Sequence, residues 1–270
     1  MRYNTQITNI DAIANGRTST ARLDVNRRYH GLKLLTFSDG VAAAADTIVD
    51  KIRLIVGSKT IREITAGDLL SIAQLNGVAV VAGELPIYFS EPWRASVMAE
   101  EATSWPMFGV NSFTLQVDLL ANVGHVSTFD LRGFWDKLPN LDQNGKPFLE
   151  IIKQLSQTAI IPAGESTINT IDIDHFIHRI LMRPIGAATI DKVRVDRDGE
   201  TIHELNSDEN TRLLKDYKLD ATAFAYPLVF DYTQQITDAM TVANSLQLKI
   251  TPSAGDTLNI LVERRVQSYA

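Results

Sequence analysis

Short runs in which apolar and polar residues alternate recur throughout the first half of the chain. This period-two alternation is typical of strands that bury one face. Eight such runs predict eight strands, at 20–25, 31–37, 51–56, 59–64, 78–81, 85–89, 112–119 and 126–131. Eight short strands is the number that builds a jelly roll.

Two helical patterns, with apolar spacings near 3.6 residues, interrupt these strands. One follows Thr65 and the other follows Pro92. Counterparts in the second half of the chain are predicted over 207–217 and 232–243. Parallel α/β folds need strands and long helices in strict alternation, so this pattern favours a β-sandwich or barrel.

The second half of the chain repeats the first. At an offset of 148 residues, segment 13–16 matches 161–164, and His30 matches His178. An offset of 141 residues relates three further pairs, namely 50–54 and 191–195, 60–64 and 201–205, and 86–89 and 227–230. An offset of 133 residues then relates 113–117 to 246–250. Because loops absorb length changes at low entropic cost, the changing offset indicates longer loops in the first copy.

The local chemistry of the two copies also agrees. Gly57-Ser58 suits a type II′ hairpin turn, and Asp198-Gly199 at the matching position suits a type I′ turn. Shortly after each turn, Thr65 with Asp68 and Asn206 with Glu209 have the N-cap and N3 pattern of a helix start. A hairpin followed by a capped helix therefore occurs twice, which indicates a duplication.

We predict an all-β fold of two tandem eight-stranded jelly-roll barrels with a few short helices. The first jelly roll is expected at residues 1–137 and the second at residues 163–270. Residues 138–162 are expected to form a connector, with a short amphipathic helix over 148–155.

Composition narrows the functional classes. The 270 residues are 45% hydrophobic and 21% charged, as in an ordinary soluble globular protein. Lys and Arg total 26 against 32 Asp and Glu, so the net charge of −6 repels phosphates and we expect no direct nucleic-acid binding. The absence of cysteine excludes disulfides and thiolate sites. No stretch approaches the roughly 20 apolar residues needed to span a bilayer.

Catalytic motifs are absent from the sequence. There is no nucleophile elbow, Walker loop, dinucleotide-binding loop or zinc-protease helix motif, and none of the five histidines forms the H-x-H pair expected of a bicupin. We therefore predict no enzymatic activity, no catalytic residue and no cofactor. His30 and His178 occupy equivalent positions in the repeat, which favours a structural role over a single active site.

One cluster has the residue types of a cation site. In an unbroken strand, Asp172, Asp174 and His178 would share one face, where a structural divalent cation such as calcium could bind. We favour the alternative, in which this polar face is turned to solvent or to a neighbouring subunit.

A duplicated, acidic, cysteine-free jelly roll without catalytic motifs resembles the double jelly-roll major capsid proteins of membrane-containing icosahedral viruses, and among them most closely the corticovirus type. The resemblance covers nearly the whole chain and depends on a few segments, namely 50–72, its partner 191–213, the Pro-x-x-Phe strands at Pro86 and Pro227, and the terminal run 246–265.

The resemblance implies a bacteriophage coat protein that forms a homotrimer, in which six barrels make a pseudo-hexagonal capsomer. Such capsomers tile a shell over an internal membrane. The implied partners are neighbouring capsomers, minor capsid and vertex proteins and the lipid membrane, and the implied location is the virion, assembled in the host cytoplasm. We expect the longer first-copy loops, 38–47 and 91–107, to make the trimer or tower contacts.

Two other functions stay open. A carbohydrate-binding or carbohydrate-cleaving double jelly roll would expose aromatic platforms or paired carboxylates on a sheet face, and aromatic residues are only 7% of this chain. A bicupin-like double barrel would hold a transition metal.

Overall fold

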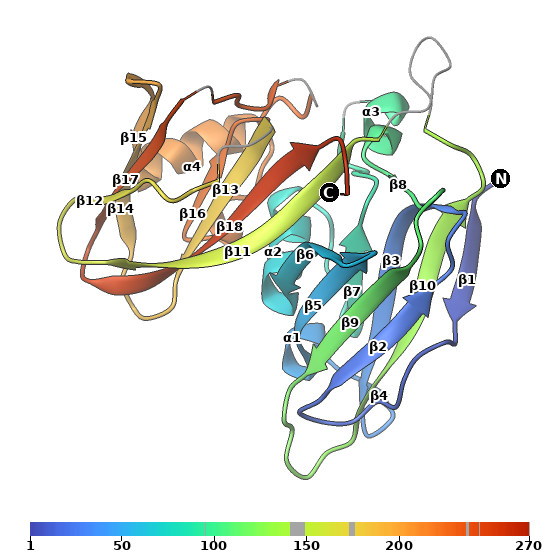
Figure 1. The fold of residues 1–270 in the computed structure, drawn as a ribbon. Helices are drawn as coiled ribbons and strands as arrows, with labels where there is room; N and C mark the ends of the chain where they lie inside the picture. The colour runs from blue at the N-terminus through green and yellow to red at the C-terminus, as the bar shows by residue number, and fades with distance from the viewer. Residues whose placement is uncertain (95, 141–148, 173–175, 236–237, 243, 270) are drawn as a thin grey trace. The chain divides into compact units, whose positions relative to one another are not determined.

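The computed structural model describes residues 1–270 apart from 95, 141–148, 173–175, 236–237, 243 and 270 (Figure 1). The chain divides into two compact units. The first comprises Met1–Ala73, Val78–Gln154 and Val266–Ala270, and the second comprises Gln74–Gly77 and Leu155–Arg265. The main division at Gln154 falls inside the segment expected to be a connector.

The described part of the first unit contains a jelly roll of two sheets. One sheet has the order β1 (Tyr3–Ile7), β10 (Ser127–Asp136), β3 (Arg28–Ser38), β7 (Glu84–Tyr88), and short strands β4 (Val41–Ala42) and β8 (Trp105–Pro106) also pair with β3. The other has the order β6 (Lys59–Thr65), β5 (Val49–Val56), β9 (Phe113–Leu119), β2 (Thr18–Leu23). The first strand of this unit, β1, and its last complete strand, β10, are neighbours, as in a jelly roll.

The second unit has the same strand order. One sheet runs β11 (Ile151–Ile161), β18 (Asp256–Val266), β13 (Phe176–Pro184), β16 (Tyr226–Val229). The other runs β12 (Ser166–Ile168), β17 (Leu246–Pro252), β14 (Ile190–Arg197), β15 (Glu200–Asn206). The prediction of an all-β double jelly roll is therefore confirmed, and strands that the repeat equates, such as β5 and β14, take the same place in the two rolls.

The hydrophobic pattern explains which face each strand buries. β9 alternates without a break, and its residues Phe113, Leu115, Val117 and Leu119 are all buried between the sheets. Burying one such side chain stabilises the fold by about 1.5–3 kcal/mol. In the second unit the equivalent strand contributes Leu246, Leu248 and Ile250 to one core cluster with residues of β13, β14 and β18.

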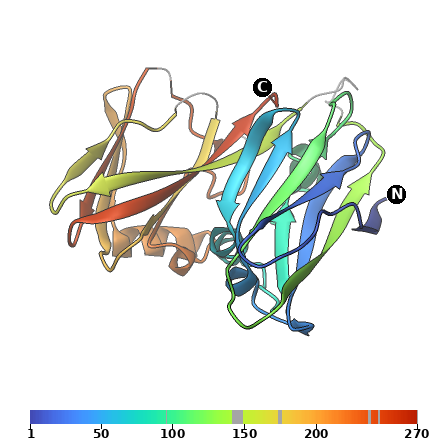
Figure 2. The same cartoon turned by 60° about the horizontal axis from the view of Figure 1, so that its bottom comes forward.

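Four α-helices and one 3₁₀ helix lie in the described chain, namely α1 (Ala45–Ile48), α2 (Ala66–Leu75), α3 (Val97–Ala102), α4 (Ser207–Asp216) and η1 (Ala221–Ala223). Both predicted caps are present. Thr65 Oγ1 accepts from the Asp68 amide at 3.0 Å, and Asn206 forms a full capping box with Glu209. In Figure 2, α4 (orange) lies at one end of the second unit's strands. None of the helices in the described ranges is long and apolar enough to cross a membrane.

Both predicted hairpin turns are also present, because their residues tolerate the left-handed backbone region. Asp198 and Gly199 have φ angles of 51° and 87°, the two positive values that a type I′ turn requires, and Gly57 has a φ of 62°. These turns connect β5 to β6 and β14 to β15.

One strand prediction is wrong, and three strands of the first unit, β1, β4 and β8, were missed. Residues 78–81 are not a strand, although three are valines, because this segment lies between left-handed Gly77 and Gly83 and has no partner strand. The true first strand is β1, whose sequence YNTQI is short and mostly polar. It is held by pairing with β10, more than 120 residues away.

Two helix predictions are also wrong. In the segment 148–155, Phe148 lies outside the described residues, and the residues from Ile151 onward belong to the long strand β11. Its apolar spacing fits both periods, and the β-branched content and pairing decide for a strand. The described part of 232–243 contains no α-helix, and Met240 instead forms an isolated bridge with Ile177.

Candidate functional site

A buried ionic cluster closes one end of the first jelly roll. The antiparallel register of β3 and β10 places Arg28 opposite Asp136. Arg28 donates to the two Asp136 carboxylate oxygens, from Nε at 3.0 Å and from the guanidinium Nη2 at 2.6 Å. Both side chains are buried. Because each charge would be costly to bury alone, the pair fixes the ends of these two strands.

His30 extends this cluster toward β7. Its Nε2 lies 2.9 Å from Asp136, and its Nδ1 lies 2.8 Å from Oγ of Ser90, which follows β7. Since the Asp136 carboxylate can only accept, His30 donates from Nε2 and accepts the Ser90 hydroxyl proton at Nδ1. A serine, a histidine and an aspartate therefore form a continuous hydrogen-bonded chain.

This chain has the residue types of an acyl-transfer triad but different surroundings. The backbone amide of Ser90, which a hydrolase would direct at a developing oxyanion, donates to the His30 carbonyl at 2.8 Å. The Asp136 charge is already neutralised by Arg28. The arrangement therefore holds strand ends together and does not present Ser90 as an activated nucleophile.

Electrostatics predict how this cluster responds to acid. Burial lowers the pKa of His30, whereas hydrogen bonds from Arg28 and His30 outweigh burial and lower the pKa of Asp136 to about 2. Each group therefore binds a proton more readily in the unfolded chain. The contribution of these two groups to the free energy of unfolding is fully present above pH 6.5. It falls as the pH drops below the ordinary histidine pKa of 6.5, and it falls again below about pH 4.

Urea unfolding of the first unit between pH 8 and pH 3 tests this expectation. Intrinsic fluorescence reports the first unit, because Trp93, Trp105 and Trp135 all belong to it. The variant His30→Gln should lose the part of the pH dependence between pH 7 and 5 and keep the part below pH 4. An unchanged profile in that variant would contradict the assignment to His30.

The second unit has a related cluster built from different partners. His178 Nδ1 lies 3.1 Å from Asp231, and Arg179 Nε donates to the same carboxylate at 3.0 Å. At the offset of 141 residues, Asp231 corresponds to Ser90. Both equivalent histidines are thus buried beside a carboxylate, but the carboxylate follows β16 in one roll and ends β10 in the other.

The candidate cation residues are only partly described. Asp174 lies outside the described residues, Asp172 is exposed and paired with Arg264, and buried His178 binds Asp231. Within the described ranges, no group of three His, Asp or Glu side chains could hold a metal ion. The proposed calcium-like site therefore stays a prediction. Arg28, Asp136, Arg179 and Asp231 were missed, although charged residues next to apolar strand runs are a signal that could have identified them.

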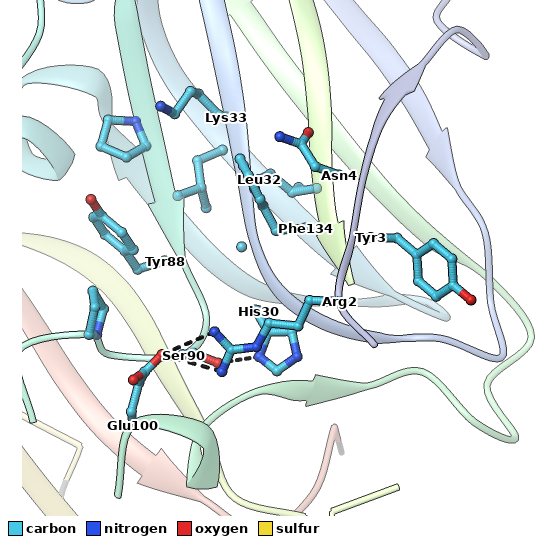
Figure 3. A pocket seen from close by; sticks show the side chains of 14 residues that line it. Arg2, Tyr3, Asn4, His30, Leu32, Lys33, Tyr88, Ser90, Glu100 and Phe134 are labelled. Carbon is cyan, nitrogen blue, oxygen red and sulfur yellow. Dashed lines mark hydrogen bonds and ion pairs between the residues drawn. The ribbon is translucent and has the colours of Figure 1, made fainter. Parts of the chain in front are cut away.

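A pocket of about 360 Å³ lies next to the first cluster, on the outer face of the sheet that contains β3. Gly31 is one of its lining residues, and an added Cβ there would lie 3.0 Å from the Ile87 carbonyl oxygen. Tyr88 and Phe134 are the in-register neighbours of Gly31 on either side. Figure 3 shows Ser90, His30 and Arg2 gathered at one end, where Arg2 pairs with Glu100, while Tyr3 points away.

Comparisons with solved structures find the same fold along the whole chain. The major capsid protein P2 from bacteriophage PM2 is 16% identical with a TM-score of 0.84, covering 99% of this chain and 98% of that one. The major capsid protein of STIV, the Sulfolobus turreted icosahedral virus, is 12% identical with a TM-score of 0.70, covering 100% and 98%. The PBCV-1 virus capsid is 9% identical with a TM-score of 0.66, covering 98% and 93%. No curated protein sequence matches the chain.

Family comparison agrees with the division into two jelly rolls. The family model of the viral coat protein P2 N-terminal domain matches residues 4–131, and the model of its C-terminal domain matches residues 151–267. The two matches include both buried ionic clusters apart from Asp136, and they leave only the segment between them and the two chain ends unmatched. The chain therefore belongs to the viral coat protein P2 family.

Proposed function

We propose that this coat protein assembles as a homotrimer whose six jelly rolls form one pseudo-hexagonal capsomer of an icosahedral shell. The observation that carries the proposal is the duplication, because two rolls with identical strand order give a three-fold trimer six similar parts. A protein with this construction can occupy a six-coordinated lattice position while obeying only three-fold symmetry.

We further propose that the role is structural and not catalytic. The hydrogen-bonded chain from Ser90 to Asp136 supports this, since its amide and its carboxylate are both committed to structural partners. The net charge of −6 supports a shell that does not touch the genome directly. An internal membrane, minor capsid and vertex proteins, neighbouring capsomers and assembly in the host cytoplasm are the other parts of the proposal, and they follow from the family resemblance.

Exposed apolar side chains support a contact between copies at the loop 38–47. Val41, beside the β3–β4 turn, is 70% exposed, and Val123 and Val126 in the loop before β10 are 94% and 65% exposed. Asp39 holds the two loops together, because its carboxylate accepts from the Val126 amide at 2.8 Å and pairs with His125. Clustered exposed valines on a soluble protein are typical of an association surface.

The loop 91–107 is a weaker candidate than expected. Trp105 and Met107 are fully buried, so this part of the loop belongs to the core of the first unit. Only its exposed positions, such as Val97 in α3, are available to a neighbouring subunit.

The mass of the purified protein in solution tests the proposed function. With a chain mass of 29.9 kDa, size exclusion with light scattering should give a trimer of about 90 kDa. Electron microscopy should then show pseudo-hexagonal particles. A monodisperse monomer across the accessible concentration range would overturn the proposal.

Charged substitutions test the loop contact. The double variant Val41→Asp with Val123→Asp should weaken trimer formation by at least about tenfold, because each valine contributes about 1–2 kcal/mol when buried. We choose substitutions and not a deletion of the loop's alanine run, because Ala45 at the end of that run is buried and its removal would also disturb the core. The control is Ile185→Asp, an exposed apolar residue of the second unit. Equal effects of variant and control on the concentration-dependent mass would contradict this contact.

A further inference from the structure

Two pairs of strands occupy equivalent positions in the duplication. β6 and β15 match residue by residue at the offset of 141, and β1 matches the start of β11 at the offset of 148. In each pair, one strand has a neighbour along its outer edge and the other does not. β6 and β11 have such a neighbour, whereas β15 and β1 end their sheets in the described chain.

The edge of β6 is covered. β6 has β5 on one side and β11 on the other, and residues Ile151–Gln154 of β11 belong to the first unit. The Arg62 side chain of β6 reaches the start of β11 and donates from Nε to the Ile152 carbonyl at 3.0 Å. As a result, Ile61 and Arg62 are only 1% and 2% exposed.

The edge of β15 is open in the described chain. β15 ends its sheet and pairs only with β14. Its residues Ile202, His203 and Leu205 correspond to the buried Ile61, Arg62 and Ile64 of β6, but all three are only partly buried. An open strand edge with apolar side chains favours pairing with another strand.

The edge of β1 is open as well. β1 ends the order of its sheet, and among the residues that the structure describes it pairs only with β10 (Figure 1). Its residues Asn4 and Gln6 are exposed, whereas the equivalent residues Ile152 and Gln154 of β11 are buried beside β6. β1 therefore has the place of the covering strand without the strand that it would cover.

The charges near the two edges are already paired within the chain. Glu204 of β15 pairs with Lys192, and Arg2, the residue before β1, pairs with Glu100 and Glu101. Strand equivalence therefore matches the two edges. In the duplication, β1 corresponds to the strand that covers β6, and β15 corresponds to β6.

We propose that β1 of one copy lies against β15 of a second copy, in the way that Ile151–Gln154 lie against β6 in the first unit. The inference rests on the proposed homotrimer and names the strands that join its subunits. Each chain contributes one β1 and one β15, so the contact is head-to-tail, and a ring of three copies satisfies every edge.

Cross-linking between two single-cysteine chains tests this proposal. The natural chain has no cysteine, and Asn4, Gln6 and Glu204 are exposed, so Asn4→Cys, Gln6→Cys and Glu204→Cys should fold normally. A chain with cysteine in β1 is co-expressed with a differently tagged chain with Glu204→Cys, and the purified trimer is treated with a short bismaleimide. Only a bond between copies can join the two tags. The matched control is Thr167→Cys on β12, the other edge of the sheet that contains β15.

We expect a cross-linked heterodimer with Glu204→Cys and none with Thr167→Cys. Amides of β15 should also exchange hydrogen more slowly in the trimer than in a dissociated sample. A protein of trimeric mass that shows neither the cross-link nor the slower exchange would overturn this strand pairing and leave the trimer intact. A monomeric mass would overturn both proposals.

Discussion

Replacing Asp231 with asparagine is expected to destabilise the second unit by about 3 kcal/mol, the low end of the cost of breaking a buried ion pair, because the change removes one carboxylate from a buried guanidinium that also pairs with Glu263. Asp231 is 0% exposed and binds both Arg179 and His178. The carboxylate of Glu263 also pairs with Arg179, at 3.6 Å from Nε, so part of the neutralising charge remains after the substitution. The ionic cluster is thus expected to dominate the stability of this roll's end.

Hydrogen exchange of peptides from β13 and β16, measured at increasing urea, gives the free energy of opening of this region. The matched control is Lys192→Gln on β14, which removes an ion pair to Glu204 of 2.6 Å whose side chains are 47% and 42% exposed. Exposed pairs of this kind contribute less than about 1 kcal/mol. If Asp231→Asn were no more destabilising than Lys192→Gln, the cluster would not support the fold as argued.

Replacing Trp105 with alanine is expected to destabilise the first unit by about 3–5 kcal/mol, the usual cost of removing a large buried aromatic side chain. Trp105 is fully buried and stacks on Phe89, with ring centroids 4.5 Å apart. The Arg62 guanidinium lies 5.0 Å from the Trp105 ring, so the substitution also removes a cation–π contact from β6.

Urea unfolding followed by the fluorescence of the remaining tryptophans measures this effect in the first unit. The control is Trp93→Ala, since Trp93 is only partly buried and contacts Tyr88 edge-on at 5.3 Å. We expect the control to cost less than half as much. Equal losses of stability would show that the Trp105 cavity refills and that its packing contributes little.

Local chemistry explains why some elements could be predicted from the residues alone. The β5–β6 and β14–β15 hairpins depend on alternation over a few residues and on turn residues that accept positive φ. The capped starts of α2 and α4 depend on Thr65 and Asn206 bonding an amide three residues later. All of these signals lie within about ten residues of each other.

Elements that depend on distant partners could not be predicted in the same way. β1 exists because β10 pairs with it, and the valine-rich segment 78–81 stays irregular because no strand lies beside it. β11 has an apolar pattern that fits either period, and its neighbours in the sheets decide for a strand.

The residues of the candidate site were also predictable only in part. The repeat identified His30 and His178 as equivalent from their position in the chain. Their partners Asp136 and Asp231 lie 106 and 53 residues away, so only the folded strands could bring them together.

By itself, the sequence determined the duplication, the hairpins, the helix caps and the resemblance to a viral coat protein, because each of these is recorded in short-range spacing or in the comparison of two copies. Only the tertiary structure decided which strand covers which edge and which charge meets which histidine. Both depend on contacts between residues far apart in the chain, where hydrophobic periodicity carries no information about the choice of partner.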